Sequence, residues 1–237
     1  MKIAILTGAN GQLGKAFLNT LVNENYYVYA VDLNIDGIIE THSIKPMVLD
    51  ITDEEKVHVF YKSIDSVDVL INNAGIGVFT AFEQRTAREF MQGMNVNLLG
   101  TFLMAQGAIK IMKHQLSGKI VNIGSIYGQV SSDERIYGDS GRNNSEVYSA
   151  TKAGVIHLTK YMATHFGKYK IQTNCISPGG IFNKQSDEFI RNYVYKNPMK
   201  RMAEASDLQS TLKYLLSEET TYLNGQNMTV DGGFVAW

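Results

Sequence analysis

Short apolar runs and helical patterns alternate along the whole chain. The apolar runs predict strands at Lys2–Leu6, Tyr27–Val31, Pro46–Leu49, Val67–Ile71, Lys119–Ile123, Ile171–Ile176 and Gln226–Val230. Helical spacing predicts a first helix that ends at about Glu24, followed by helices over Glu54–Ile64, Asn95–Gln115, Val147–His165 and Asp207–Leu216. Strands that alternate with helices require crossover connections on both faces of a mostly parallel sheet. We therefore predict an α/β fold, a doubly wound (Rossmann) parallel sheet of about seven strands, in a single domain over residues 1–237.

Two segments do not fit this alternation. Tyr127–Glu146 is polar, and Phe182–Ala205 mixes aromatic with charged residues. Long excursions in a compact domain are usually functional loops or lids. The aromatic segment is either a substrate lid or a plain helical packing face. In an open α/β sheet, ligands bind at the carboxyl ends of the strands, and each motif considered below falls at such an end.

A glycine-rich turn follows the first strand and opens the first helix. Its sequence is Gly8-Ala9-Asn10-Gly11-Gln12-Leu13-Gly14, and Asp32 ends the second strand, followed by Leu33. Glycines allow the tight turn and a close approach of a pyrophosphate to free N–H groups, although they also occur in plain turns. A carboxylate at Asp32 accepts hydrogen bonds from the adenosine ribose hydroxyls and repels a 2′-phosphate, unless it is a simple turn residue. This pattern predicts NAD rather than NADP as the cofactor.

The ends of the third and fourth strands supply further candidates for the cofactor site. Asp50 and Ile51 end the third strand, where an acidic side chain can meet the adenine amino group. Asp50 can equally be a helix N-cap. The fourth strand ends on Asn73-Ala74-Gly75, in which the asparagine can link neighbouring strand ends and the two small residues leave room for a ribose.

A tyrosine and a lysine lie one helical turn apart near the start of a predicted helix. Tyr148 and Lys152 have the i, i+4 spacing that puts the phenol and the ammonium on one face. A nearby ammonium favours a phenolate and so suits tyrosine for general acid–base catalysis. Ser125, at the end of the fifth strand, can hold the substrate oxygen. Asn97, near the start of the long helix, can anchor a water that connects Lys152 to solvent.

Taken together, these motifs resemble the short-chain dehydrogenase/reductase family over essentially the whole chain. The matches follow the family order: Thr7-Gly8 with its glycine turn, Asp32, Asn72-Asn73-Ala74-Gly75, Asn97, Ser125, Tyr148 with Lys152, Pro178-Gly179, Pro198-Met199-Lys200-Arg201-Met202 and Asp231-Gly232-Gly233. The resemblance implies an NAD-dependent oxidoreductase that transfers a hydride between nicotinamide and an alcohol or carbonyl carbon.

The same resemblance implies a role for each candidate catalytic residue. Tyr148 would be the acid/base, and Lys152 would favour its phenolate and orient the nicotinamide ribose. Ser125 would stabilise the substrate oxygen, and Asn97 would complete a proton relay. The turn Pro178–Ile181 would contact the nicotinamide carboxamide, with Gly179 and Ile181 among its contacts. Related enzymes commonly pair long helices, so a homodimer or homotetramer is expected.

The chain departs from the family pattern in two places. Its middle glycine is Gly11, whereas the commonest family pattern has a glycine at the position of Gln12. This spacing resembles the longer sugar-nucleotide epimerases and dehydratases. The loop Ile126–Val147 is also longer than in compact members, and it is either a surface insertion or a substrate-facing loop in which Arg135 or Arg142 meets an anion. Through this loop the chain is similar to the narrower group of flagellin modification protein A-like members, which implies a sugar or sugar-phosphate substrate.

Composition narrows the remaining function classes. The chain has 237 residues with 22 basic and 23 acidic side chains, a balance that gives no basic footprint for nucleic acid or an anionic membrane. Five scattered histidines lack metal-ligand spacing, so no metal is expected. One cysteine and an N-terminus too short in apolar residues for a signal or membrane segment predict a cytoplasmic protein. Two rival functions stay open: an NAD-dependent sugar epimerase or dehydratase, and a nucleotide-sensing binding protein without turnover.

Overall fold

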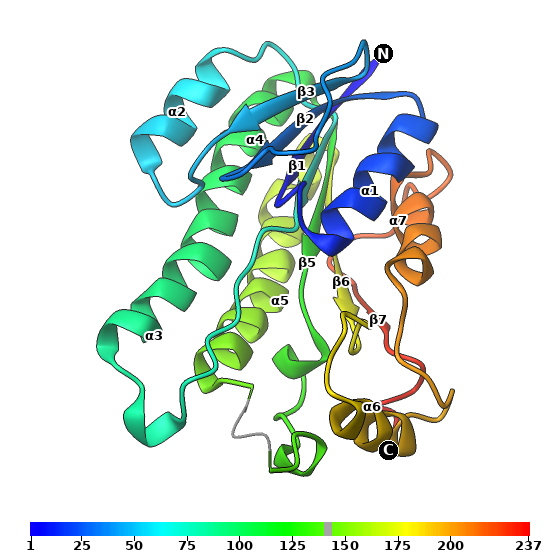
Figure 1. Cartoon of the computed structure of the whole chain (residues 1–237). Helices are drawn as coiled ribbons and strands as arrows, with labels where there is room; N and C mark the ends of the chain where they lie inside the picture. Colours follow the sequence, from blue (N-terminus) through cyan, green and yellow to red (C-terminus); the bar gives the residue numbers. More distant parts are fainter. Residues whose placement is uncertain (140–143) are drawn as a thin grey trace.

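The computed structural model describes residues 1–139 and 144–237. In these residues the strands are β1 (Lys2–Thr7), β2 (Tyr26–Asp32), β3 (Ile44–Val48), β4 (Val69–Asn72), β5 (Gly118–Ile123), β6 (Ile171–Pro178) and β7 (Asn227–Val230). They form one sheet in the order β3-β2-β1-β4-β5-β6-β7, and every neighbouring pair is parallel (Figure 1). The predicted doubly wound sheet is therefore confirmed. The chain reverses direction across the sheet between β1 and β4, which is where such folds bind ligands.

Helices cover both faces of the sheet. The helices α1 (Gln12–Asn23) and α7 (Gln209–Leu216) pack on one face, and α2 (Glu54–Lys62), α4 (Thr101–Gln115) and α5 (Glu146–Phe166) pack on the other (Figure 1). Alternate strand residues contribute to the two cores: Ile5 lies in the core under α2, α4 and α5, and Leu6 lies in the core under α1 and α7. This two-sided burial explains why the strands appear as apolar runs rather than as alternating patterns.

The long helix predicted to start at Asn95 has a different beginning. A separate helix, α3 (Ala87–Met94), precedes it, and a π-helical turn over Asn95–Gly100 joins α3 to α4. Thr86 caps α3 in a capping box with Glu89, which is a start signal present in the sequence that the prediction did not use. An extra residue in a helical turn widens the local hydrogen-bond ladder, and such turns occur often at functional sites.

The aromatic segment contains a helix that the sequence prediction left undecided. This helix, α6 (Asp187–Lys196), starts at the N-cap Ser186, whose side chain accepts a hydrogen bond from the backbone N–H of Phe189. A third apolar cluster joins α6 to the loop after β5 and to the end of the chain; its buried members are Ile126, Ile136, Tyr193, Met202 and Phe234. The segment is therefore a packed element beside the carboxyl ends of the strands.

The cysteine of the chain lies in the interior, in strand β6. Cys175 is fully buried, and its backbone N–H donates to the carbonyl of Gln226. Burial raises the pKa of the Cys175 thiol to about 11. The thiol is therefore protonated at neutral pH and behaves as a small apolar side chain, in agreement with its prediction as a core residue.

Candidate functional site

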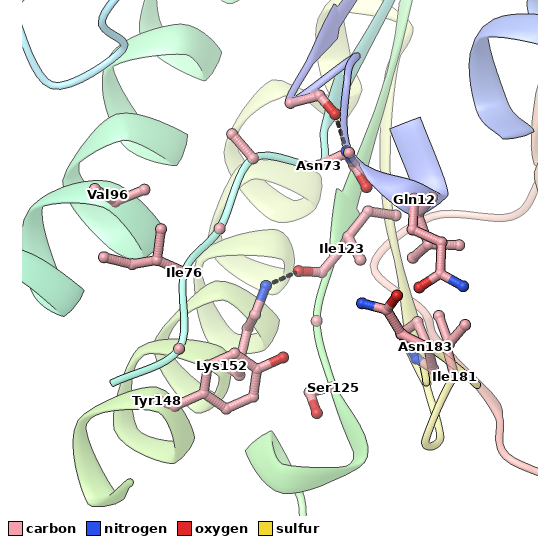
Figure 2. A pocket seen from close by; sticks show the side chains of 18 of the residues that line it. Gln12, Asn73, Ile76, Val96, Ile123, Ser125, Tyr148, Lys152, Ile181 and Asn183 are labelled. Atoms are coloured by element: carbon pink, nitrogen blue, oxygen red, sulfur yellow. Dashed lines mark hydrogen bonds between the residues drawn. The ribbon is translucent and has the colours of Figure 1, made fainter. Parts of the chain in front are cut away.

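The carboxyl ends of the strands surround a cavity of about 770 Å³ (Figure 2). Its lining includes most of the residues singled out in the sequence: Gly8, Asn10, Gly11, Gln12, Leu13, Asp32, Leu33, Asp50, Ile51, Asn73, Ala74, Gly75, Ser125, Tyr148, Lys152, Pro178, Gly179 and Ile181. Two of the candidates, Gly14 and Asn97, do not line the cavity. One cavity thus joins the glycine turn to the tyrosine and lysine of α5.

The glycine turn and the end of β4 are bonded to each other. Gly8 has a φ of +66°, a left-handed conformation that suits glycine, and a Cβ there would lie 2.8 Å from the Cα of Ala74. Asn73 Nδ2 donates to the carbonyl oxygens of Thr7 and Gly8 at 3.0 and 2.9 Å, while Thr7 Oγ1 accepts from the Asn73 N–H at 3.0 Å. These bonds fix the turn with its backbone facing the cavity.

The end of the cavity beside β2 carries the predicted carboxylate. Asp32 Oδ2 accepts a hydrogen bond from the Asn10 N–H at 2.9 Å, and Oδ1 accepts from the Asn34 N–H at 3.2 Å. Each carboxylate oxygen can accept further bonds, so Asp32 can still bind ribose hydroxyls. Asn10 Oδ1 is buried and has no hydrogen-bond partner among the residues that the structure describes. A site with these acceptors beside a glycine turn fits the adenosine half of a dinucleotide.

Asp50 lines the same end but also has a local structural role. Its Oδ1 accepts from both the N–H and the hydroxyl of Thr52, at 2.9 and 2.7 Å. The N-cap of α2 is Asp53, whose side chain accepts from the Lys56 N–H, so Asp50 does not cap that helix. Ile51 is buried against the cavity wall. The alternative that Asp50 is an N-cap is therefore wrong, and the carboxyl stands at the cavity in a turn before the helix.

Three polar side chains meet at the other end of the cavity. Lys152 is only 5% exposed, and its ammonium donates to the Ile123 carbonyl at 2.7 Å and lies 5.6 Å from the centre of the Tyr148 ring. Tyr148 lies in the first turn of α5, where the N-cap Ser145 accepts its backbone N–H. Figure 2 shows the Tyr148 phenol and the Ser125 side chain facing the same space. A hydroxyl, a phenol and a buried ammonium can together bind a substrate oxygen and move a proton to it.

Asn97 occupies the π-helical turn and faces the protein interior. It is 1% exposed; its Oδ1 accepts from the Ile76 N–H at 2.8 Å, and its Nδ2 donates to the Ile76 carbonyl and to Thr151 Oγ1. Both amide hydrogens are thus used to hold the segment after β4 against α5. A Cβ at Gly75 would lie 3.4 Å from Asn97 Oδ1 and 3.5 Å from Lys152 Nζ, so this glycine separates the two groups.

Gly14 acts on the site through the glycine turn. A Cβ at Gly14 would lie 2.0 Å from the Gly8 carbonyl oxygen and 2.8 Å from the backbone of Ala9. The absence of a side chain at this position lets α1 start directly under the turn. Gly14 therefore positions the helix N-terminus and does not itself line the cavity.

Four aromatic residues also line the cavity, and they come from the two segments that the sequence left open as a substrate-facing loop and a substrate lid. Tyr127 and Tyr137 come from the loop after β5, and Phe189 and Tyr193 come from α6. The Phe189 ring lies 5.2 Å from the ring of Tyr137 and 6.1 Å from that of Tyr193, so these three rings form one wall, and Tyr127 lines the same cavity. Burial raises the pKa of both Tyr127 and Tyr193, and their hydroxyls therefore remain protonated donors at neutral pH. The i, i+4 spacing of Phe189 and Tyr193 after the N-cap Ser186 is the sequence signal that places both rings on one face of a helix.

The predicted anion contact concerns two loop arginines, of which Arg135 lies in the described part of the chain. Arg135 forms two hydrogen bonds of 2.8 Å with the carboxylate of Asp133, and its side chain is 86% exposed. This pairing holds the pKa of Asp133 well below its usual range, and it directs the guanidinium away from the cavity. Arg135 does not line the cavity and is paired with a carboxylate on its own loop, which favours the surface alternative for this residue, and its contact with an anion stays a prediction. Arg142 lies outside the described residues.

The chain is similar to known proteins over nearly its whole length. A family model described as enoyl-(acyl carrier protein) reductase matches residues 8–235. Levodione reductase from Leifsonia aquatica is 30% identical over 259 residues, which cover 98% of this chain and 93% of that protein. A short-chain dehydrogenase from Leptospira borgpetersenii, solved with bound NAD+, shares 41% identity at a TM-score of 0.94, covering 98% of this chain and 92% of the other. ElxO, solved with NADP, is 26% identical at a TM-score of 0.86, covering 100% and 99%.

Proposed function

Because the chain belongs to the short-chain dehydrogenase/reductase family, whose members oxidise CH–OH or reduce C=O groups, we propose that it transfers a hydride between NAD and a polar, sugar-like substrate. The observation that carries the proposal is the meeting of Ser125, Tyr148 and Lys152 in the cavity that the glycine turn also lines. Solved structures of related proteins contain NAD+ or NADP, which supports a nicotinamide dinucleotide as the cofactor.

The chain's own residues supply the proton chemistry of this proposal. NAD, when bound, accepts or supplies the hydride. The Ser125 hydroxyl hydrogen-bonds the substrate oxygen. The Tyr148 phenol delivers a proton to that oxygen during reduction, and the Tyr148 phenolate removes one from it during oxidation. The Lys152 ammonium, fixed by the Ile123 carbonyl at 2.7 Å, favours the phenolate that remains after proton transfer. Asn97 has the role of holding the segment after β4 in place beside Lys152.

The cofactor preference gives a first prediction. NADH should bind more tightly than NADPH, because Asp32 at the adenosine end would repel a 2′-phosphate. Replacing Asp32 with alanine should reduce the ratio of the Kd for NADPH to the Kd for NADH by about tenfold or more, as expected for removing one close pair of like charges. Fluorescence titration of both reduced cofactors measures this difference.

The matched control for this prediction is Asp36→Ala. Asp36 is an exposed carboxylate in the same loop after β2, and its backbone N–H donates to Asn34 Oδ1. This variant should keep the wild-type preference. Equal affinities of the wild-type protein for NADH and NADPH would refute the assignment of NAD.

The substrate end of the cavity supports a polar ring as the substrate. The aromatic faces of Tyr137 and Phe189 can pack against the C–H face of a ring, and the hydroxyl of Tyr127 and the amide of Asn183 can bond its hydroxyl groups. The resemblance to flagellin modification protein A-like members supports the same class. Hydroxylated sugars and sugar phosphates are accordingly the first compounds to test for thermal shift and for a change in NADH absorbance.

That screen also separates the proposal from its rivals. Substrate-dependent loss or gain of NADH absorbance supports net oxidoreduction. Conversion of a sugar that requires NAD but leaves NADH absorbance unchanged would instead support an epimerase or dehydratase. Tight NADH binding with no conversion of any compound would support a nucleotide-sensing protein.

An apolar surface on α3, the π-helical turn, the start of α4 and α5 supports a homo-oligomer. An apolar groove there is lined by Met91, Met94, Asn95, Leu98, Leu99, Phe102, Gly154, His157, Leu158 and Tyr161. Phe102 is 42% exposed and Leu99 is 40% exposed, and large exposed apolar surfaces of this kind mark association sites. The expected occupant is the same groove of a second copy, because a two-fold axis brings identical patches together.

Sedimentation of the wild-type protein at micromolar concentration should therefore show a dimer or tetramer. Phe102→Glu should shift it toward the monomer, since the new carboxylate would be buried without a partner. Tyr222→Glu is the matched control, because Tyr222 is fully exposed on a loop away from the groove. A wild-type monomer would contradict the assembly proposal.

A cytoplasmic location is the simplest expectation for this enzyme. Cys175 is buried and protonated, as suits a chain that makes no use of disulfides. Within the described residues no helix is both long and apolar enough to cross a bilayer. Fractionation of the cells that express the protein tests the location directly.

A further inference from the structure

The side chain that departs from the family's glycine pattern forms a bond across the cofactor region of the cavity. Gln12, the first residue of α1, is exposed and lines the cavity, and its Nε2 donates to the carbonyl of Phe182 at 2.5 Å. Figure 2 shows Gln12 beside Ile181 and Asn183, on the far side of the cavity from Lys152. The bond therefore links the turn after β1 to the segment after β6.

The acceptor of this bond is held by the protein on its other side. The Phe182 N–H donates to the Ala203 carbonyl at 2.8 Å, and the Ala203 N–H donates to the Gly180 carbonyl at 3.0 Å. Tyr193, stacked on Phe234 with ring centres 4.7 Å apart, accepts the Gly180 N–H at 2.6 Å. The backbone around Phe182 is thus fixed to α6 and to the segment before α7, whereas Gln12 is a single flexible side chain.

The two ends of the bond belong to opposite walls of the proposed cofactor site. Gly8, Gly11 and Leu13 on the Gln12 side, and Pro178 and Gly179 on the other, line the same cavity. The N-terminus of α1 is where a pyrophosphate would bind, between these walls. A link from Gln12 to Phe182 consequently joins the two walls between which the pyrophosphate would lie.

We propose that Gln12 is a strap that must open each time the dinucleotide enters or leaves. The proposal rests on the proposed function only in requiring that a nicotinamide dinucleotide binds here. In this proposal the bond between Gln12 and Phe182 forms both with and without the cofactor, so it affects the rates of cofactor entry and release but not the affinity. A residue that instead bonded the cofactor would slow only its dissociation. The two roles therefore predict different kinetics for the same substitution.

Stopped-flow fluorescence of NADH with the purified full chain tests the strap. Gln12→Ala should raise both the association and the dissociation rate constant by about 3- to 10-fold, the range expected for losing one hydrogen bond, while Kd changes less than about twofold. Gln12→Met, which keeps the length of the side chain but has no donor, should behave in the same way.

The matched control is Gln209→Ala. Gln209 in α7 also donates its amide to a backbone carbonyl, that of Ala16 in α1 at 2.8 Å, but it does not line the cavity. Its removal should leave both rate constants at their wild-type values. Unchanged rates for Gln12→Ala, or a rise in dissociation alone, would refute the strap while leaving the proposed function intact. Failure of the wild-type protein to bind NADH would instead refute the proposed function, and the strap with it.

Discussion

Tyr148→Phe should reduce turnover by about 10²–10⁴-fold while leaving NADH affinity close to the wild-type value. Hydride transfer to a carbonyl carbon leaves negative charge on the substrate oxygen, which needs a proton as the charge forms. Tyr148 stands beside Ser125 at the cavity, and the substitution removes only the phenolic oxygen. NADH titration measures the affinity, and steady-state absorbance with the substrate found by screening measures turnover.

Tyr214→Phe is the matched control for this experiment. Tyr214 is half-exposed on α7, outside the cavity, so its hydroxyl should be dispensable for turnover. If Tyr148→Phe retained nearly full activity, the catalytic assignment would be lost and the nucleotide-sensing alternative would gain support. A parallel loss of NADH binding would point to a disturbed fold rather than to a missing proton donor.

Gly14→Ala should lower both the free energy of unfolding and the affinity for NADH, although Gly14 does not line the cavity. The added Cβ would lie 2.0 Å from the Gly8 carbonyl oxygen, so the turn and the start of α1 must separate. Overpacking of this kind typically lowers the free energy of unfolding by about 1–3 kcal/mol. Because the displaced backbone would form the phosphate cradle of the proposed cofactor site, the Kd for NADH should also rise by about tenfold or more.

Thermal unfolding and NADH titration of Gly14→Ala measure the two effects. Lys15→Ala is the control, since Lys15 is the next residue of the same helix and is exposed. It should retain the wild-type melting temperature and Kd. A Gly14→Ala protein with both values unchanged would mean that α1 can shift without moving the turn.

The parts of the site that the sequence predicted are those set by local backbone geometry. The glycine turn needs a positive φ at Gly8 and a close approach at Gly14, and few other residue types meet these requirements. The strands were identifiable because both of their faces are buried, and the parallel order followed from the intervening helices. Asp32 was predicted as a cavity residue because it ends the second strand, next to the glycine turn that follows the first.

The parts that escaped prediction depend on contacts between distant segments. The bonds between the Asn97 side chain and the Ile76 backbone carry no sequence mark, and the water proposed at Asn97 stays a prediction. Arg135 looked available for an anion because its pairing with Asp133 depends on how the loop turns. The aromatic wall combines a loop after β5 with α6, and no periodicity within either segment indicates that the two meet.

The inert thiol of Cys175 makes this chain a convenient host for spectroscopic labels. With one cysteine in the sequence, and that one buried with a pKa of about 11, maleimide reagents near pH 7 have no native thiolate to modify. A second cysteine introduced at an exposed position would then carry the dye alone. Substituting Asn183 on one wall of the cavity, for example, would put a fluorophore where it could report the opening of the site in real time.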